Sequence, residues 1–173
     1  MLCEASILEN LQPIQDPEMP ISIVDLGLIE TIRVERDDGT ARVVIEIVPT
    51  FVGCPALDMI RDDVVQAVGA MEGVSTVDVH FVHAPPWSVD RITPAGRASL
   101  AAHGVTVPAH GAPSSGADAS SDVDKVTLGV SALACPFCDS RETQIESPFG
   151  PTRCRMVFYC NACKNTFEHL KRV

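Results

Sequence analysis

Residues 135–138 read Cys-Pro-Phe-Cys, and residues 160–163 read Cys-Asn-Ala-Cys. Two residues separate the cysteines within each pair, and 21 residues separate the two pairs. A two-residue gap lets both thiolates of a pair turn toward one ion, and two such pairs complete a tetrahedron of soft ligands. The pattern predicts a zinc-ribbon-like β module over residues 131–173, in which structural zinc is held by Cys135, Cys138, Cys160 and Cys163.

A fifth cysteine, Cys154, lies six residues before Cys160. On a predicted strand over residues 153–159 it would share a face with Met156 and Phe158, so a packed thiol in a small core is the favoured interpretation. A fifth thiol close to four others is nonetheless a candidate alternative ligand. Cys3, close to the N-terminus, is assigned no role.

The preceding part of the chain, residues 1–105, predicts a small α+β domain. Apolar residues at spacings of three and four predict a helix from Pro55 to Met71. An Asp-Gly pair at residues 38–39 between two alternating segments predicts a hairpin. The expected order is α-β-β-α-β-α, with helices on a three-stranded sheet. The link from the second strand to the third fits a right-handed crossover, and antiparallel pairing is left open.

Between the two modules, residues 106–130 are rich in Pro, Gly, Ala and Ser. Such a segment has too few large apolar side chains to build a core, so it predicts a flexible linker. The domain prediction is therefore residues 1–105, a linker over 106–130, and the metal module over 131–173.

Charge and hydropathy exclude several classes of function. Residues 1–105 hold 6 Lys/Arg against 16 Asp/Glu, which gives a net charge of −10, and residues 135–173 hold 6 against 4. Because no basic stripe is present, nucleic acid is not an expected partner. No apolar run approaches the roughly 20 residues that cross a bilayer. The paired cysteines and the lack of a secretory leader predict a reducing, cytoplasmic location.

The first domain contains one notable thiol and one notable carboxylate. Cys54 lies between a predicted strand and a predicted helix. With Pro55 as the first helical residue, Cys54 would be the N-cap, where the helix dipole favours a thiolate. The alternative is a buried cysteine that acts as a small apolar residue. Asp25, inside an apolar run, either caps the turn beside Gly27 or belongs to a site.

Four motifs of this domain together resemble the iron–sulfur assembly domain of SufT-like proteins and eukaryotic cytosolic cluster-targeting factors. They are Asp16-Pro17-Glu18-x-Pro20, Val24-Asp25-Leu26-Gly27-Leu28-Ile29, Thr50-x-x-x-Cys54-Pro55, and Pro85-Pro86-Trp87-Ser88 with Arg91-Ile92-Thr93. With the C-terminal cysteines and Phe149-Gly150-x-Thr152-x-Cys154 added, the whole chain is similar to the PaaD (PaaJ) family of bacterial phenylacetate degradation.

The resemblance implies an accessory protein that is not itself an enzyme. Its expected partners are the subunits of a multicomponent di-iron oxygenase, which epoxidises the ring of phenylacetyl-CoA, and of the flavin- and iron–sulfur-containing reductase. Its expected task is to mature or insert an iron–sulfur cluster, with transient binding of iron or of the cluster. The family's characteristic positions fall on Asp25, Thr50 and Cys54, and Trp87 either lines this site or packs over the core.

Two alternatives stay open at this point. One is a non-catalytic structural subunit held stably in the oxygenase. The other is a rubredoxin-like electron-transfer module with iron in the tail, although Asp139 and Lys164 occupy the positions where glycine typically follows each rubredoxin knuckle. A homo-oligomer is also left open.

Overall fold

The computed structural model describes residues 2–37, 39–111 and 133–172. The chain divides into two compact units, Met1–Leu100 and Ala101–Val173. The first contains α1 (Glu4–Leu11), β1 (Ile29–Asp37), β2 (Thr40–Ile47), α2 (Leu57–Gly69), β3 (Val74–Phe81), the 3-10 turn η1 (Val89–Arg91) and most of α3 (Pro94–Ala102). The second contains β4 (Val105–Thr106), β5 (Thr143–Ser147), β6 (Arg155–Cys160) and β7 (Thr166–Leu170).

The first unit is built on a three-stranded sheet in the order β1-β2-β3. β1 and β2 form an antiparallel hairpin in which Asp37 pairs with Thr40, and Gly39 in its tight turn has φ +85°. β2 and β3 are connected by α2 and pair in parallel, so the antiparallel alternative that the sequence left open does not occur. The α+β prediction is confirmed.

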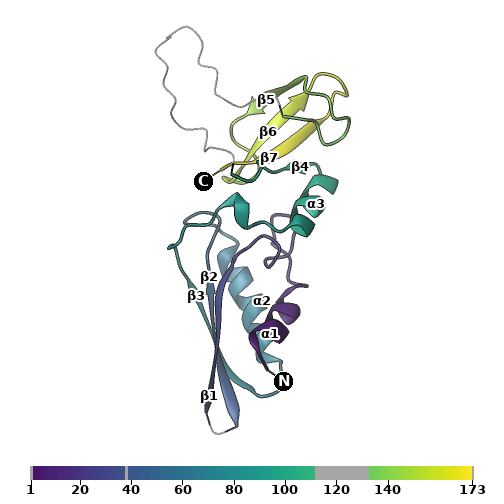
Figure 1. Ribbon diagram of the computed structural model, residues 1–173. Coiled ribbons are helices and arrows are strands. Elements are labelled where there is room, and N and C mark those ends of the chain that lie inside the picture. The colour runs from purple at the N-terminus through teal and green to yellow at the C-terminus, as the bar shows by residue number, and fades with distance from the viewer. Residues whose placement is uncertain (1, 38, 112–132, 173) are drawn as a thin grey trace. The chain divides into compact units, whose positions relative to one another are not determined.

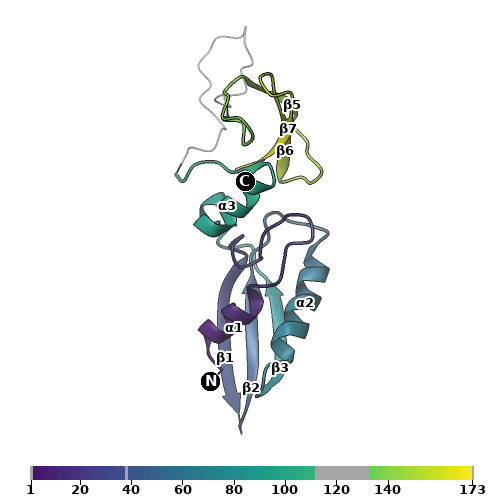
Figure 2. The ribbon, with the colours of Figure 1, turned by 90° about the vertical axis from the view of Figure 1, so that its right-hand side faces the viewer.

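One face of this sheet is covered by α1 and α2 (Figure 1 and Figure 2). The buried side chains on the two helices recur at spacings of four, as a helix with one apolar face requires. They are Ile7 and Leu11 on α1, and Ile60, Val64 and Val68 on α2. Val43, Ile45 and Ile47 of β2 are fully buried, as alternation along a strand predicts.

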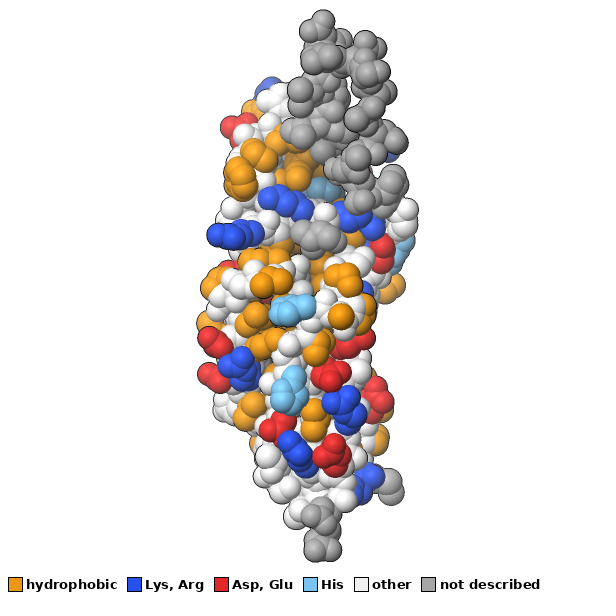
Figure 3. Space-filling view, turned by 90° about the vertical axis from the view of Figure 1, so that its left-hand side faces the viewer, with side chains coloured by type: hydrophobic (Ala, Val, Ile, Leu, Met, Phe, Trp, Pro, Cys, Tyr) orange, Lys and Arg blue, Asp and Glu red, His pale blue; other side chains and the backbone are white. Residues whose placement is uncertain are grey.

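The other face of the sheet carries charged side chains (Figure 3). Arg33 pairs with Glu46 at 3.0 Å, and Arg42 pairs with Asp78 at 2.6 Å. These pairs are open to solvent, so each contributes little to stability. Their main consequence is that positive and negative charges offset each other across this face.

The predicted bounds of α2 were wrong at both ends. The helix begins at Leu57 rather than Pro55, because the Leu57 N–H bonds the Cys54 carbonyl three residues back, at 3.4 Å, in a turn that precedes the helix. Its N-cap is Ala56 and its C-cap is Ala70, one residue before the predicted end.

The second unit contains a four-stranded sheet in the order β4-β7-β6-β5. Its central apolar cluster consists of Cys135, Phe158, Cys160 and Phe167, with two thiols among the four side chains. Val105, Cys154 and Leu170 are buried as well. The two phenylalanine rings stack with centroids 5.5 Å apart. So small an apolar core needs an added source of stability, such as a metal or a disulfide.

β4 joins this sheet through parallel pairing with β7, where Val105 lies opposite Glu168 and Thr106 opposite His169. The Glu168 N–H also bonds the Gly104 carbonyl at 3.0 Å. The predicted linker, residues 106–130, lies mostly outside the described residues, and the predicted domain bounds stay predictions. Within the described ranges, no helix is long and apolar enough to cross a membrane.

Candidate functional site

The four cysteines of the two CxxC pairs come together in the second unit. The sulfur atoms of Cys135, Cys138, Cys160 and Cys163 all lie within 4.8 Å of one another. The Cys135–Cys163 and Cys138–Cys160 sulfur atoms are each 3.6 Å apart, so the close approaches run between the two pairs. Zinc–sulfur bonds of about 2.3 Å would place tetrahedral sulfurs about 3.8 Å apart. The arrangement therefore fits a metal ion.

Matching backbone turns position the two cysteine pairs. The Asp139 N–H bonds the Cys135 carbonyl, and the Lys164 N–H bonds the Cys160 carbonyl, each at 2.9 Å. Asp139 and Lys164 adopt left-handed conformations with φ +58° and +63°. A side chain is thus tolerated where rubredoxin knuckles use glycine. The absence of glycine at positions 139 and 164 therefore does not argue against iron bound by the four cysteines.

Hydrogen bonds and burial raise the pKa of some of these thiols and lower that of another. The backbone N–H of Asn165, followed by its side-chain amide, lowers the pKa of Cys163 to about 6. For Cys138 the backbone N–H of Ser140 favours the thiolate, but burial and the neighbouring thiols outweigh it and raise the pKa to about 12. Burial also raises the pKa of Cys135. Four thiolates together therefore require a cation among them.

Cys154 does not belong to this four-sulfur group. Its side chain is buried, its sulfur lies 3.1 Å from the Thr152 hydroxyl, and its carbonyl accepts the Lys171 N–H at 2.8 Å. These contacts favour the packed-thiol interpretation over a ligand.

In the first unit, three loops meet at one end of the sheet (Figure 1). Because β2 and β3 are parallel and β1 is antiparallel to β2, the loop that leads into β1 and the loops that leave β2 and β3 share this end. The Val48 N–H bonds the Leu28 carbonyl at 2.8 Å, which ties two of these loops together. Asp25, Thr50 and Cys54 all lie on these loops.

Asp25 is held by hydrogen bonds from distant parts of the chain. Its two carboxylate oxygens accept the Gln12 amide at 2.5 Å and the Thr93 hydroxyl at 2.6 Å. Thr93 also accepts the Gly96 N–H at 3.0 Å, which makes it the cap of α3. Asp25 therefore anchors the start of α3 to the loop before β1. Sequence reasoning missed Gln12, because no local pattern links it to Asp25.

Two further motif residues fasten the same loop. The buried Trp87 donates its indole N–H to the Leu26 carbonyl at 2.9 Å, so it packs over the core. Arg91 donates to the Gly27 carbonyl at 2.8 Å and pairs with Glu30 at 2.7 Å. A Cβ on Gly27 would lie 2.6 Å from the Arg91 carbonyl oxygen, so only glycine fits this approach. These contacts of Trp87 and Arg91 thus hold the loop that leads into β1 in one conformation.

Cys54 lies on the loop after β2 and is partly exposed. It follows Gly53, with φ +81°, and Val52, whose side chain is 74% exposed. Since Ala56 is the N-cap of α2, the prediction that Cys54 caps this helix was wrong. Thr50 on the same loop is buried. The loop thus leaves Cys54 partly exposed, two residues before the N-cap of α2.

The N-cap environment predicted for Cys54 occurs instead at Cys3. Cys3 is the N-cap of α1, and its thiol and backbone exchange hydrogen bonds with Ser6. The Ser6 N–H, and then the Ser6 hydroxyl, lower the pKa of the exposed Cys3 thiol. The sequence offered a signal, because Ser6 stands at the position of a capping-box partner.

Comparison with known proteins assigns a family to each unit. Residues 4–79 match the iron-sulfur cluster assembly protein family, and residues 119–171 match the PaaD zinc beta ribbon domain. In solved structures, the DUF59 domain of Bacillus anthracis matches with a TM-score of 0.50 and 32% identity, covering 56% of this chain and 90% of that chain.

Two related proteins support this assignment of a family to each unit. The Fe-S protein maturation auxiliary factor YitW of Bacillus subtilis (strain 168) is 32% identical over 88 residues, which cover 51% of this chain and 83% of YitW. A protein of Escherichia coli (strain K12) that is named as a subunit of 1,2-phenylacetyl-CoA epoxidase is 31% identical over 162 residues, covering 93% of this chain and 88% of the relative. An iron–sulfur assembly domain followed by a tetrathiolate ribbon, matched along nearly its whole length, places the chain in the PaaD family.

Proposed function

We propose that this protein is a non-catalytic accessory factor that helps to mature or insert an iron–sulfur cluster. The client in this proposal is the reductase of a phenylacetyl-CoA-epoxidising oxygenase. The observation that carries the proposal is the convergence of Asp25, Thr50 and Cys54 at one end of a sheet whose sequence matches the iron-sulfur cluster assembly family. The Bacillus subtilis relative is named as an Fe-S protein maturation auxiliary factor, which supports a protein that is not itself an enzyme.

In this proposal the two units have different tasks. Cys54, on an exposed loop, offers a thiolate that can bond iron of the cargo and release it again. Asp25 and Thr93 hold the neighbouring loop in place, so that the cargo meets a preformed surface. Zinc at the four tail cysteines would supply structure and no redox chemistry.

A strain that lacks this protein tests the proposal. It should still make the reductase with normal flavin, but with a depleted cluster, as read from absorbance and iron content. Cys54→Ala should copy this defect, because it removes the thiol that would bond the cargo. Cys3→Ala is the matched control: it removes another exposed thiol of the same unit and should leave the cluster intact.

The competing candidate is a structural subunit of the oxygenase, favoured by the Escherichia coli relative, whose name makes it a component of an epoxidase. In that case the oxygenase would fail to assemble in the strain that lacks the protein, while the reductase would keep a full cluster. This result would defeat the maturation proposal. A stable stoichiometric complex on co-purification would point the same way.

A further inference from the structure

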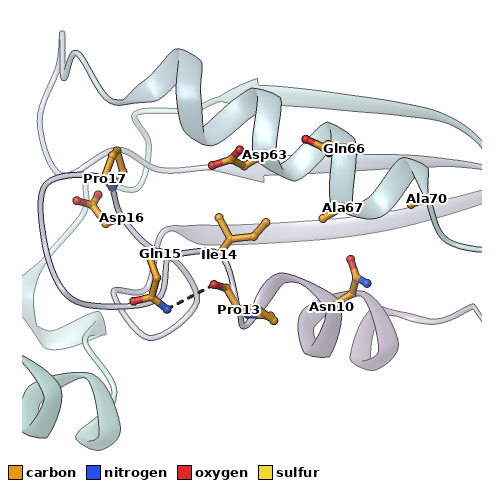
Figure 4. A pocket seen from close by; sticks show the side chains of 10 residues that line it. All are labelled: Asn10, Pro13, Ile14, Gln15, Asp16, Pro17, Asp63, Gln66, Ala67 and Ala70. Atoms are coloured by element: carbon orange, nitrogen blue, oxygen red, sulfur yellow. Dashed lines mark hydrogen bonds between the residues drawn. The ribbon is translucent and has the colours of Figure 1, made fainter.

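A groove of about 620 Å³ lies between α2 and the segment that follows α1 (Figure 4). One wall comes from α2 and its C-cap residue, through Asp63, Gln66, Ala67 and Ala70. The other comes from Asn10, Pro13, Ile14, Gln15, Asp16 and Pro17. Its volume falls within the range of about 300–1,000 Å³ usual for binding sites. None of Asp25, Thr50 and Cys54 lines it, so it is distinct from the site proposed above.

The lining combines a narrow apolar floor with amide groups. Ala67 and Ala70 are three residues apart on one side of α2, and their small side chains leave room above the helix. Ile14 points toward α2 from the opposite wall (Figure 4). Asn10 and Gln66 each carry a donor and an acceptor, the groups that peptide bonds of an extended segment require. The Gln15 amide already donates to the Pro13 carbonyl at 3.5 Å and leaves its oxygen as an acceptor (Figure 4).

The charged side chains that line the groove are both acidic. Residues 1–32 contain no lysine or arginine. The one basic residue of α2, Arg61, already pairs with Asp58 at 2.9 Å and lies over the Phe81 ring. Asp16 and Asp63 both line the groove. The opposite face of the sheet differs, because its arginines and acids pair with each other (Figure 3).

The loop wall is held in shape before any partner arrives. The Asp16 N–H bonds the Ile21 carbonyl at 2.8 Å, and the Asp16 carboxylate accepts the Glu18 N–H at 2.9 Å. Pro13 and Pro17 restrict the backbone on either side. Binding in such a groove loses little conformational entropy on the side of this chain.

We propose that this groove binds an extended segment of a partner protein that carries an arginine or a lysine between small apolar residues. The cation lies against the exposed Asp63, the apolar residues lie over Ala67 and Ala70, and the amide side chains bond the peptide backbone. The proposal goes beyond cluster maturation, since it requires neither a cluster nor Cys54.

The test is an NMR titration of the full-length, ¹⁵N-labelled, metal-loaded protein. The probe is an acetylated and amidated pentapeptide with arginine at its centre and alanine and glycine around it, compared with the same peptide carrying glutamate. The arginine peptide should shift the amides of Asn10, Gln15, Ala67 and Ala70, and the glutamate peptide should not. Cys54→Ala should bind as the parent protein does, which separates this test from that of the proposed function.

Matched variants locate the contact. Asp63→Asn should weaken binding about fivefold to tenfold, since it removes a charge beside the cation. Asp62→Asn removes the same charge from the neighbouring exposed position outside the lining, and should change the affinity less than about twofold. Ala67→Leu should abolish binding by filling the floor, with unchanged amide shifts in β1–β3 as the check on folding.

Four results would overturn the proposal. Equal losses in the Asp62 and Asp63 variants would indicate non-specific attraction to an acidic surface. Shifts confined to other residues would place the contact elsewhere. Equal shifts with arginine amide alone would show a site for small cations rather than for a peptide. Groove shifts that depend on protein concentration without peptide would assign the groove to a second copy of this chain.

Discussion

The two units of this protein reach stability by different routes. The first has a continuous apolar core, in which side chains from α1, α2 and β2 are fully buried. In the second, the central apolar cluster has four side chains, two of them thiols of the candidate metal centre. One unit is thus held by burial of apolar area, and the other depends on a bound ion that its cysteines would share. Removal of one metal-centre thiol should therefore lower the stability of the second unit far more than removal of one methyl group lowers the stability of the first.

The largest expected effect is the loss of a metal ligand. Cys135→Ser should unfold the second unit and leave the first intact, because the free energy of binding a structural zinc is on the order of 10 kcal/mol in small modules. Amide spectra should lose the dispersed signals of residues 135–170 while those of α1 and α2 persist. Elemental analysis of the parent protein should find zinc, and a colourless protein would distinguish it from a red ferric site.

Cys154→Ser is the control for that experiment, since it removes a buried thiol outside the four-sulfur group. It should retain the metal. Freshly purified parent protein without any bound metal would refute the assignment of a metal centre, and loss of metal from the Cys154 variant would restore Cys154 as a ligand.

A smaller effect is expected from a cavity in the first unit. Ile45→Ala should lower its free energy of unfolding by about 2–5 kcal/mol, because the side chain is fully buried between helices and sheet. Metal content should not change. Met59→Ala, at a side chain 58% exposed, should be nearly neutral in the same denaturant titration. If Ile45→Ala also released the metal, the two units would not be independent.

The contribution of β4 to the second unit should be smaller again. A fragment over residues 101–173 keeps Val105, which is buried, and its pairing with β7. A fragment over residues 131–173 lacks both and exposes one edge of β7. We expect the shorter fragment to be less stable by about 1–3 kcal/mol, from one lost apolar side chain and its hydrogen bonds. Equal melting temperatures of the zinc-loaded fragments would show that β4 adds nothing.

The smallest effect concerns two thiols of the first unit. Cys3 should be alkylated at lower pH than Cys54, because hydrogen bonds from Ser6 lower the pKa of Cys3. A series of alkylation rates against pH, read by mass spectrometry, measures both thiols in one sample. Ser6→Ala should shift the Cys3 profile upward and leave Cys54 unchanged. A Cys54 that reacts first would show that another feature of its loop activates it.

Several features were correctly predicted because their causes are local. The turn at Gly39 depends on a few adjacent residues, and the apolar stripe of α2 depends on the helical repeat. The four metal-centre cysteines were found because a CxxC spacing itself brings two sulfurs together. The start of α2 was missed because a turn after Cys54 competes with the helix for the same backbone groups.

What the sequence alone determined is therefore the α-β-β-α-β-α order of the first unit, its α+β class and the identity of the four clustered thiols. The tertiary structure decided how distant segments meet: the parallel pairing of β2 with β3, the addition of β4 to β7, and the anchoring of Asp25 by Gln12 and Thr93, which lie 13 and 68 residues away. It also decided that Cys3, rather than Cys54, caps a helix. The physical reason is that such contacts depend on packing of the whole unit, which no local spacing encodes.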